Sequence, residues 1–217
     1  MRSPSGSFRF PSSASGSFRF EELPVVPGTL LGTAIVGAMD HFVEKHGRAA
    51  GHAMIDLLSP SARMWVHPHA PSLGFLGARR YPYAVVGELV RAIAKVTKAT
   101  SEDAVHRELA TAGLDASLGT VARAVLRLLV TPRLFCERAQ EAWDAFHDSG
   151  VMLSEYGPHD FTSSITEWPN HDPTVCKLST MSAGLLFERM GLPDVSVTRL
   201  ECQTWGHPRC TMRVRWA

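Results

Sequence analysis

The sequence predicts an α+β domain in which a helical N-terminal half is followed by an antiparallel sheet packed with helices. Three observations lead to this prediction. Apolar residues recur at helical spacing through most of residues 32–147, apolar and polar residues alternate in several later segments, and Gly and Pro separate these segments. With 45% hydrophobic residues in a chain of 217, there is enough apolar material for the core of one domain.

The first 27 residues differ from the rest of the chain. Ser3–Phe10 recurs as Ser13–Phe20 with seven of eight positions identical, and this Ser/Gly-rich segment cannot bury enough surface to order itself. We therefore expect residues 1–27 to be a flexible tail and residues 28–217 to form the folded domain. Each Phe-Arg-Phe triplet would place both Phe side chains on one face of a strand. The candidate partner-binding residues are Phe8, Arg9, Phe10, Phe18, Arg19 and Phe20. Duplicated docking motifs raise the effective concentration at a partner, and an accidental duplication is the alternative.

Apolar stripes and end signals define the predicted helices. Gly47 ends the first helix, Ser101 caps a later one, and Pro132 lies in the first turn of the last helix of this half. The predicted helices cover 32–46, 48–58, 83–98, a segment that starts after Ser101, 118–130 and 132–147. Because 118–130 is strongly apolar, we expect it to be a central buried helix. Pro and Gly interrupt residues 61–81, which should form a loop with room for one helical turn.

The last third of the chain predicts the sheet. Residues 151–156 and 161–168 alternate in polarity around Gly157-Pro158, as the strands of a hairpin do. A helical pattern then returns over 173–190, and two further strands are expected at 195–203 and 211–216. Strands gathered behind a helical half favour an antiparallel sheet.

Composition excludes several classes of function. The chain has 22 basic and 21 acidic residues, and this balance argues against general nucleic-acid binding. No apolar run approaches the roughly 20 residues that span a bilayer, and the N-terminus has no continuous apolar stretch of the secretory kind. Four cysteines are too few to staple a domain of this size, which favours reduced thiols or a metal site. We therefore expect a cytoplasmic protein that contacts neither nucleic acid nor membrane.

Motifs of catalysis are missing from the sequence. It contains no Gly-x-Ser-x-Gly, Walker-type loop or His-Glu-x-x-His, and we assign no catalytic residue. The sequence therefore predicts a protein that is not an enzyme.

Two parts of the sequence resemble a known family. The stretch Glu201–Trp216, with a cysteine, a Gly-containing turn, a second cysteine and an alternating strand, resembles the closing hairpin of the 4-vinyl reductase domain family. The front half resembles a myxobacterial paralogous family of unknown function, related to haem-NO-binding-associated and vinyl-reductase domains. The motifs that resemble it are Gly32-Thr33-Ala34, Phe42-Val43, His46-Gly47, Leu57-Leu58 and Arg80-Tyr81-Pro82.

The resemblance covers residues 28–217 and implies a 4-vinyl reductase-like fold that binds or senses a ligand, in a domain of a kind that often forms homodimers. The family's usual Trp-Tyr-Pro appears here as Arg80-Tyr81-Pro82, and no Gly-rich turn for a nicotinamide is present. Reductase activity is therefore not expected.

Three cysteines are candidates for zinc ligation. Cys176, Cys202 and Cys210 are 26 and 8 residues apart, a spacing similar to that of the zinc-ligating cysteines in the vinyl-reductase-like domains of aromatic-sensing regulators. Those domains have an acidic fourth ligand three residues before the second cysteine, where this chain has Arg199, so Glu201 or His207 would have to replace it. Three buried thiols that pack without metal are the alternative, which is favoured because free cysteine is among the most buried residue types.

Aromatic residues of the back half are candidates for a lipophilic pocket: Trp143, Phe146, Tyr156, Phe161, Trp168 and Phe187. The same residues could equally form an ordinary core. Asn170 and His171 are candidate polar groups at the mouth of such a pocket. The predicted function is non-enzymatic, sensory or regulatory binding of a small lipophilic ligand, with the tail as a docking segment. The alternative is a scaffold that binds a protein partner through its Phe-Arg-Phe repeats and has lost the ligand.

Overall fold

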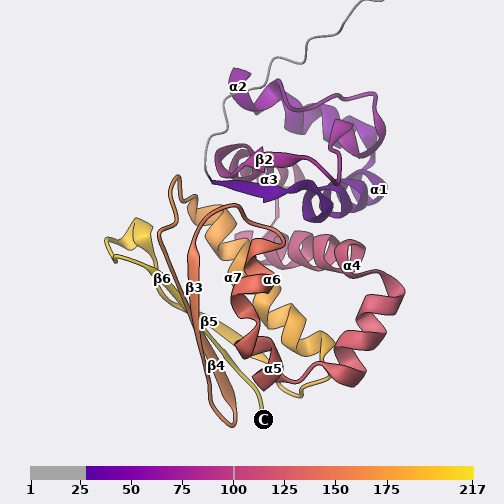
Figure 1. Ribbon diagram of the computed structural model, residues 1–217. Coiled ribbons are helices and arrows are strands. Elements are labelled where there is room, and N and C mark those ends of the chain that lie inside the picture. The colour runs from indigo at the N-terminus through magenta and orange to yellow at the C-terminus, as the bar shows by residue number, and fades with distance from the viewer. Residues whose placement is uncertain (1–27, 100) are drawn as a thin grey trace, which may run out of the picture.

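The structure is a computed structural model that describes residues 28–99 and 101–217, so the repeat tail and its Phe-Arg-Phe triplets lie outside the described residues. A helical N-terminal half lies beside a four-stranded antiparallel sheet packed with helices (Figure 1). This arrangement confirms the predicted α+β class.

The front half consists of helices around a small two-stranded ribbon. Its elements are β1 (Thr29–Leu31), α1 (Gly32–Asp56), α2 (Pro60–Arg63), the 3₁₀ turn η1 (Pro71–Gly74), β2 (Arg80–Pro82) and α3 (Tyr83–Thr97). Gly47 has φ 81° and ψ 165° and divides α1 where the sequence predicts a helix end. The segment predicted as a loop holds α2, η1 and β2, and β2 pairs antiparallel with β1.

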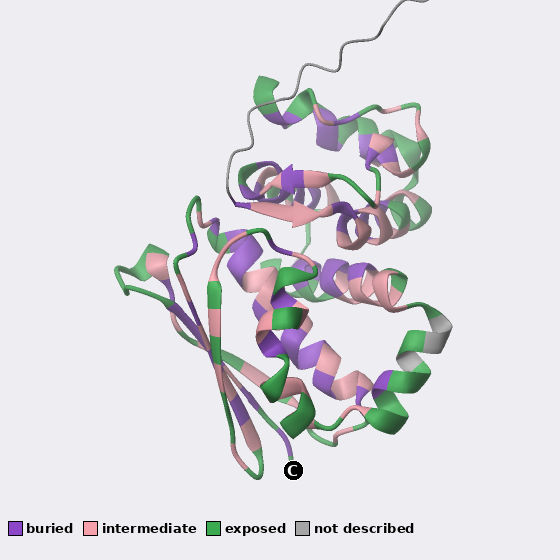
Figure 2. Cartoon of the chain, viewed as in Figure 1, coloured by how far each residue is buried: buried purple, intermediate pink, exposed green. Residues whose placement is uncertain are grey.

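Helix α4 (Glu102–Leu129) corrects one prediction. It begins as expected, because the hydroxyl of Ser101 accepts a hydrogen bond from the backbone N–H of Asp103. At Gly119, with φ 57° and ψ 177°, the helical path is broken. The prediction that 118–130 is a central buried helix is wrong, because Leu128 and Leu129 are 78% and 69% exposed. Figure 2 shows this second part of α4 largely exposed. An apolar sequence shows only that a segment could be buried. Because α4 changes direction at Gly119, Leu128 and Leu129 lie on the surface.

The helix predicted over 132–147 is two short helices, α5 (Pro132–Glu137) and α6 (Ala139–Asp144). Thr131 caps α5 by accepting a hydrogen bond from the N–H of Leu134. Arg138, with φ −116° and ψ 13°, separates the two helices and lets α6 pack against the start of the sheet.

The sheet has the strand order β3-β4-β6-β5, and every neighbouring pair is antiparallel. Its strands are β3 (Val151–Tyr156), β4 (Asp160–Thr166), β5 (Ser196–Glu201) and β6 (Cys210–Arg215), with a short 3₁₀ turn η2 (Gln203–Trp205) between the last two. Helix α7 (Pro173–Arg189) packs on the face of the sheet that α5 and α6 also cover (Figure 1). The strand and helix predictions of the back half are confirmed to within a few residues at each end.

Two clusters of buried side chains form the core. The larger one joins α1, α3 and the first turn of α7, and the smaller one lies between the later turns of α7 and the sheet. Helix α7 therefore connects the helical half to the sheet. Among the described residues, none of the helices has the length and apolarity needed to cross a membrane.

Candidate metal centre and ligand cavity

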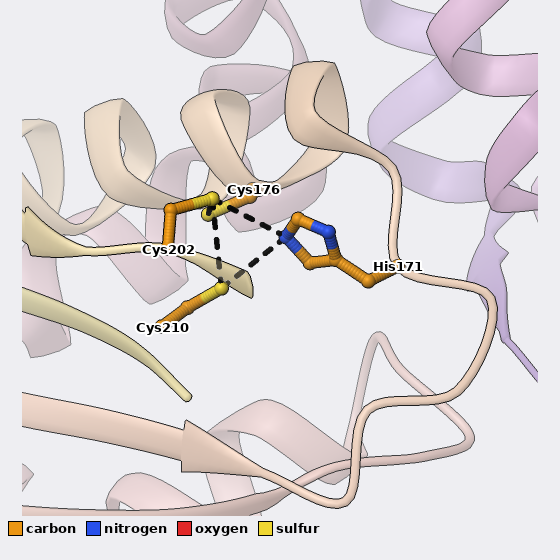
Figure 3. A group of neighbouring side chains, drawn as sticks. All are labelled: His171, Cys176, Cys202 and Cys210. Carbon is orange, nitrogen blue, oxygen red and sulfur yellow. Dashed lines mark hydrogen bonds between the residues drawn. The ribbon is translucent and has the colours of Figure 1, made fainter. Parts of the chain in front are cut away.

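Four potential metal ligands converge where α7 begins (Figure 3). Cys176 lies in the first turn of α7, Cys202 directly follows β5, and Cys210 is the first residue of β6. His171 comes from the loop that precedes α7. Asp172 fixes this loop, because its carboxylate caps α7 by accepting hydrogen bonds from the backbone N–H groups of the next turn and also pairs with Arg91 of α3. We call the four converging residues the Cys/His centre.

The geometry of the Cys/His centre suits a tetrahedral ion. The Cys202 sulfur lies 3.9 Å from each of the sulfurs of Cys176 and Cys210. The Nε2 of His171 lies 3.2 Å from the Cys210 sulfur and 3.8 Å from that of Cys202. Tetrahedral zinc with usual bond lengths separates two sulfurs by about 3.8 Å and a nitrogen from a sulfur by about 3.6 Å. All four ligand atoms lie within 4.8 Å of one another, so they fit one small ion.

The chemistry of the Cys/His centre also suits a soft metal ion. Its three thiols are free and buried. The interaction with the Cys176 thiol lowers the pKa of Cys210, and the contact of Cys210 with His171 lowers it further. The same interaction between the two thiols raises the pKa of Cys176. Thiolate sulfur and neutral imidazole are the ligands that zinc prefers.

Sequence reasoning found three of these residues and missed the fourth. Glu201 is paired with Arg209 and Thr211, and His207 is exposed on the hairpin, so neither predicted substitute joins the thiols. Arg199 lies over the ring of Trp205. His171, which the sequence suggested for a pocket mouth, occupies the fourth position instead. Its place five residues before Cys176, directly before the helix-capping Asp172, was the available signal.

A second feature is an apolar cavity between the helical half and the sheet. Its volume is about 400 Å³, within the range of ligand sites. Side chains from α1, α3, α4, α5, α6, α7 and the sheet line it, and none of the lining residues that the structure describes is Asp, Glu, Lys or Arg. The polar lining residues are Ser117, His147, Ser179 and Ser182.

Three of the six aromatic residues predicted for a pocket line this cavity. They are Trp143, Phe146 and Phe161. Trp168 is buried behind Trp143, with the two rings perpendicular at 5.0 Å, and the buried Phe187 packs behind Phe161. Tyr156 lies at the end of β3, stacks on Trp216 and is 45% exposed. The sequence marked all six as candidate lining residues, but the packing of α5, α6 and α7 decided which of them reach the cavity.

One of the lining residues is a histidine whose ring is held by two aromatic neighbours. The His147 ring stacks on Trp143 with centroids 3.5 Å apart, and its Nδ1 lies 2.8 Å from the Tyr83 hydroxyl. Burial lowers the pKa of His147 to about 3 and raises that of Tyr83 to about 12. Both groups are therefore neutral at physiological pH, and the lining side chains that the structure describes carry no charge.

Comparison with solved structures identifies the architecture. An H-NOX protein from S. oneidensis in the Fe(II)NO ligation state superposes with a TM-score of 0.61 at 10% identity, covering 86% of this chain and 99% of that one. The Fe(II) unliganded H-NOX protein from K. algicida gives 0.62 at 11% identity, covering 86% and 96%. This chain has an H-NOX-like fold. A structure from work on haem distortion in the H-NOX family gives 0.59 at 9% identity, covering 85% and 94%.

At these identities the likeness concerns the fold alone. The sequence matches no model of a protein family, and no curated protein is significantly similar to it. The 4-vinyl reductase and myxobacterial resemblances therefore stay predictions.

The residues of the cavity do not fit haem. A haem brings two propionate carboxylates, and none of the lining side chains that the structure describes is a cation that could pair with them. An axial ligand is also needed, commonly a histidine free to turn toward the iron. His147 is the histidine among the lining residues, and its ring is held by Trp143 and Tyr83. We therefore derive no haem chemistry for this chain.

Proposed function

We propose that this chain is a non-enzymatic sensory domain that binds a small lipophilic molecule in its apolar cavity. The cavity carries the proposal, because a space of about 400 Å³ lined by apolar side chains is what such a ligand requires. The H-NOX-like fold supports it, since one of the similar structures is described in a ligand-bound state. Ligand binding in a bistable fold is the basis of small-molecule sensing.

Two measurements on the purified chain test this proposal: binding of Nile red, a neutral lipophilic dye, and native mass spectrometry. We expect saturable dye binding or a retained small molecule. Ala142→Phe fills the cavity from α6 and should weaken dye binding by about tenfold or more. Ala145→Phe is the matched control, because Ala145 is exposed at the end of the same helix. Absence of any saturable binding and of any retained molecule would refute the proposal.

We also propose that the Cys/His centre binds one structural Zn²⁺. The near-tetrahedral spacing of three buried thiols and one imidazole supports this, and it favours the relation to vinyl-reductase-like domains that the cysteine spacing suggested. Zinc there would cross-link the start of α7 to the β5–β6 hairpin. Four protein ligands leave no open position for a reacting water, as is typical of structural sites.

Elemental analysis of the purified chain tests the zinc proposal. One zinc per chain is expected, and His171→Ala should lower the occupancy or weaken retention against a chelator at least tenfold. His207→Ala is the control, since His207 lies on the exposed part of the same hairpin. Equal metal content in these two variants would exclude His171 as a ligand.

We propose finally that residues 1–27 form a docking tail and residues 28–217 the folded domain. The start of β1 supports this boundary, because the Asp148 carboxylate accepts hydrogen bonds from the N–H groups of Gly28 and Thr29. Deletion of residues 1–20 should abolish capture of a protein partner and leave dye binding intact. If deletion changes no interaction, the tail has no docking role. If partners are lost and the intact chain binds no ligand, the protein is a scaffold. Sedimentation of the same samples reports whether the chain is a homodimer.

A further inference from the structure

We infer that the ligand of the cavity is a neutral lipophilic molecule with a hydroxyl or carbonyl oxygen, and that the hydroxyls of Ser179 and Ser182 bind this oxygen. The inference rests on the proposed function and specifies its ligand class. It follows from the few polar groups that the cavity contains and from what each of them already bonds.

Both serines lie on the stripe of α7 that faces the cavity. The lining residues of α7 are Val175, Leu178, Ser179, Ser182, Ala183 and Leu186. This spacing of three and four residues marks one face of a helix. Ser179 and Ser182 are three residues apart, so their side chains are neighbours and can approach one ligand atom together.

Other helical hydroxyls of the described chain provide a comparison for this pair. A Ser or Thr inside a helix commonly donates its hydroxyl hydrogen to the carbonyl four residues earlier. Four hydroxyls here do so, and they belong to Thr97, Thr111, Ser117 and Thr180. Among the described residues, no hydrogen bond is formed by the hydroxyls of Ser179 and Ser182, nor by the buried Thr33 hydroxyl of α1. The two serine hydroxyls are therefore available to a ligand.

The remaining polar lining residues are already engaged. Ser117 donates to the carbonyl of Gly113, and His147 bonds the Tyr83 hydroxyl while its ring face is covered by Trp143. The α7 pair is thus the polar feature of the cavity best placed to orient a ligand. A hydroxyl both donates and accepts, so it matches an alcohol, phenol, aldehyde or ketone oxygen.

Charged ligands are disfavoured by the same wall. Among the lining side chains that the structure describes, His147 is the titratable one, and its neutral ring cannot balance a carboxylate. A buried charge without a partner loses its hydration and gains nothing in return. The described lining therefore disfavours long-chain carboxylates, for the same reason that it does not suit the propionates of haem.

Displacement of Nile red by three probes of equal length tests the inference on the full chain. The probes are decan-1-ol, decanoate at pH 8 and decane. We expect decanol to displace the dye at a concentration at least tenfold lower than decanoate. Ser179→Ala combined with Ser182→Ala should weaken decanol binding roughly 2- to 10-fold per hydroxyl lost, the range for a single hydrogen bond, and leave decane unchanged.

Ser117→Ala is the matched control. It removes the same atom from the same cavity, but from a hydroxyl that is already bonded within α4, so decanol affinity should stay within twofold of the unsubstituted chain. Displacement by decanoate as good as that by decanol would overturn the neutral class. Equal decanol affinities of the double variant and the Ser117→Ala control would overturn the role of the serines. Either result can occur while Nile red still binds and Ala142→Phe still blocks it, so failure of this inference is distinguishable from failure of the proposed function.

Discussion

The Cys/His centre and the cavity both lie along α7, yet they are specified in opposite ways. The centre depends on four side chains from three separate segments, each of which supplies one atom at a defined distance. The cavity depends on many apolar side chains, and for most of them only their size and their lack of charge matter. A single substitution should therefore damage the centre far more than the cavity.

The largest expected effect tests the centre. Cys202→Ser removes the ligand whose sulfur contacts both other thiols, and we expect loss of bound zinc together with at least about 3 kcal/mol of unfolding free energy. Urea unfolding with parallel metal analysis measures both quantities. Cys136→Ser is the control, because Cys136 lies on α5 outside the centre. If both variants unfold at the same urea concentration, the centre contributes no more than an ordinary packed thiol.

The second effect tests the support of the centre. A Cβ added at Gly87 of α3 would lie 2.4–2.5 Å from the Asp172 carboxylate, which caps α7 directly after His171. Gly87→Ala should therefore destabilise the fold by about 1–3 kcal/mol and weaken zinc retention. Gly77→Ala is the comparison, since a Cβ there meets nothing closer than 3.4 Å. Unchanged zinc retention in the Gly87 variant would show that the loop before α7 adjusts freely.

A third effect belongs to the cavity and depends on pH. His147 has a pKa of about 3 in the folded chain and 6.5 in the unfolded chain. Below pH 6.5 its imidazole is therefore protonated in the unfolded chain but stays neutral in the folded one. Stability is unaffected above pH 6.5 and falls as the pH drops from 6.5 toward 3. Between pH 6.5 and 5 the loss should be about 1.5 kcal/mol. In His147→Phe, the unfolding free energy obtained from urea titrations should fall by about 1.5 kcal/mol less over this pH range. Identical pH profiles of the two proteins would contradict the burial of a neutral imidazole.

The smallest effect is expected on the exposed side of α4, outside the cavity. Leu128 is 78% exposed although its segment is strongly apolar, so Leu128→Lys should change the unfolding free energy by less than about 0.5 kcal/mol. Leu126→Lys, two residues away, places a charge at a buried position that lines the cavity and should cost several times more. Thermal denaturation of the two variants compares them directly. A large cost at Leu128 would indicate that this surface is covered in solution.

Local signals in the sequence determined much of this protein. Polarity periods, caps and glycine breaks located α1, α3, α7 and all four strands of the main sheet, because those features act within a few residues. The spacing of Cys176, Cys202 and Cys210 likewise indicated that three thiols could meet, since a helix packed on a hairpin brings those positions together.

Tertiary structure decided what depends on long-range packing. His171 became the fourth member of the centre because Asp172 and Arg91 hold its loop, and no local pattern records that contact. The exposure of Leu128 and Leu129 and the choice of Trp143 over Trp168 as a cavity wall were decided in the same way. The periodicity of a sequence predicts which side chains lie on one face of a helix or strand. Which residues that face contacts depends on how distant elements pack.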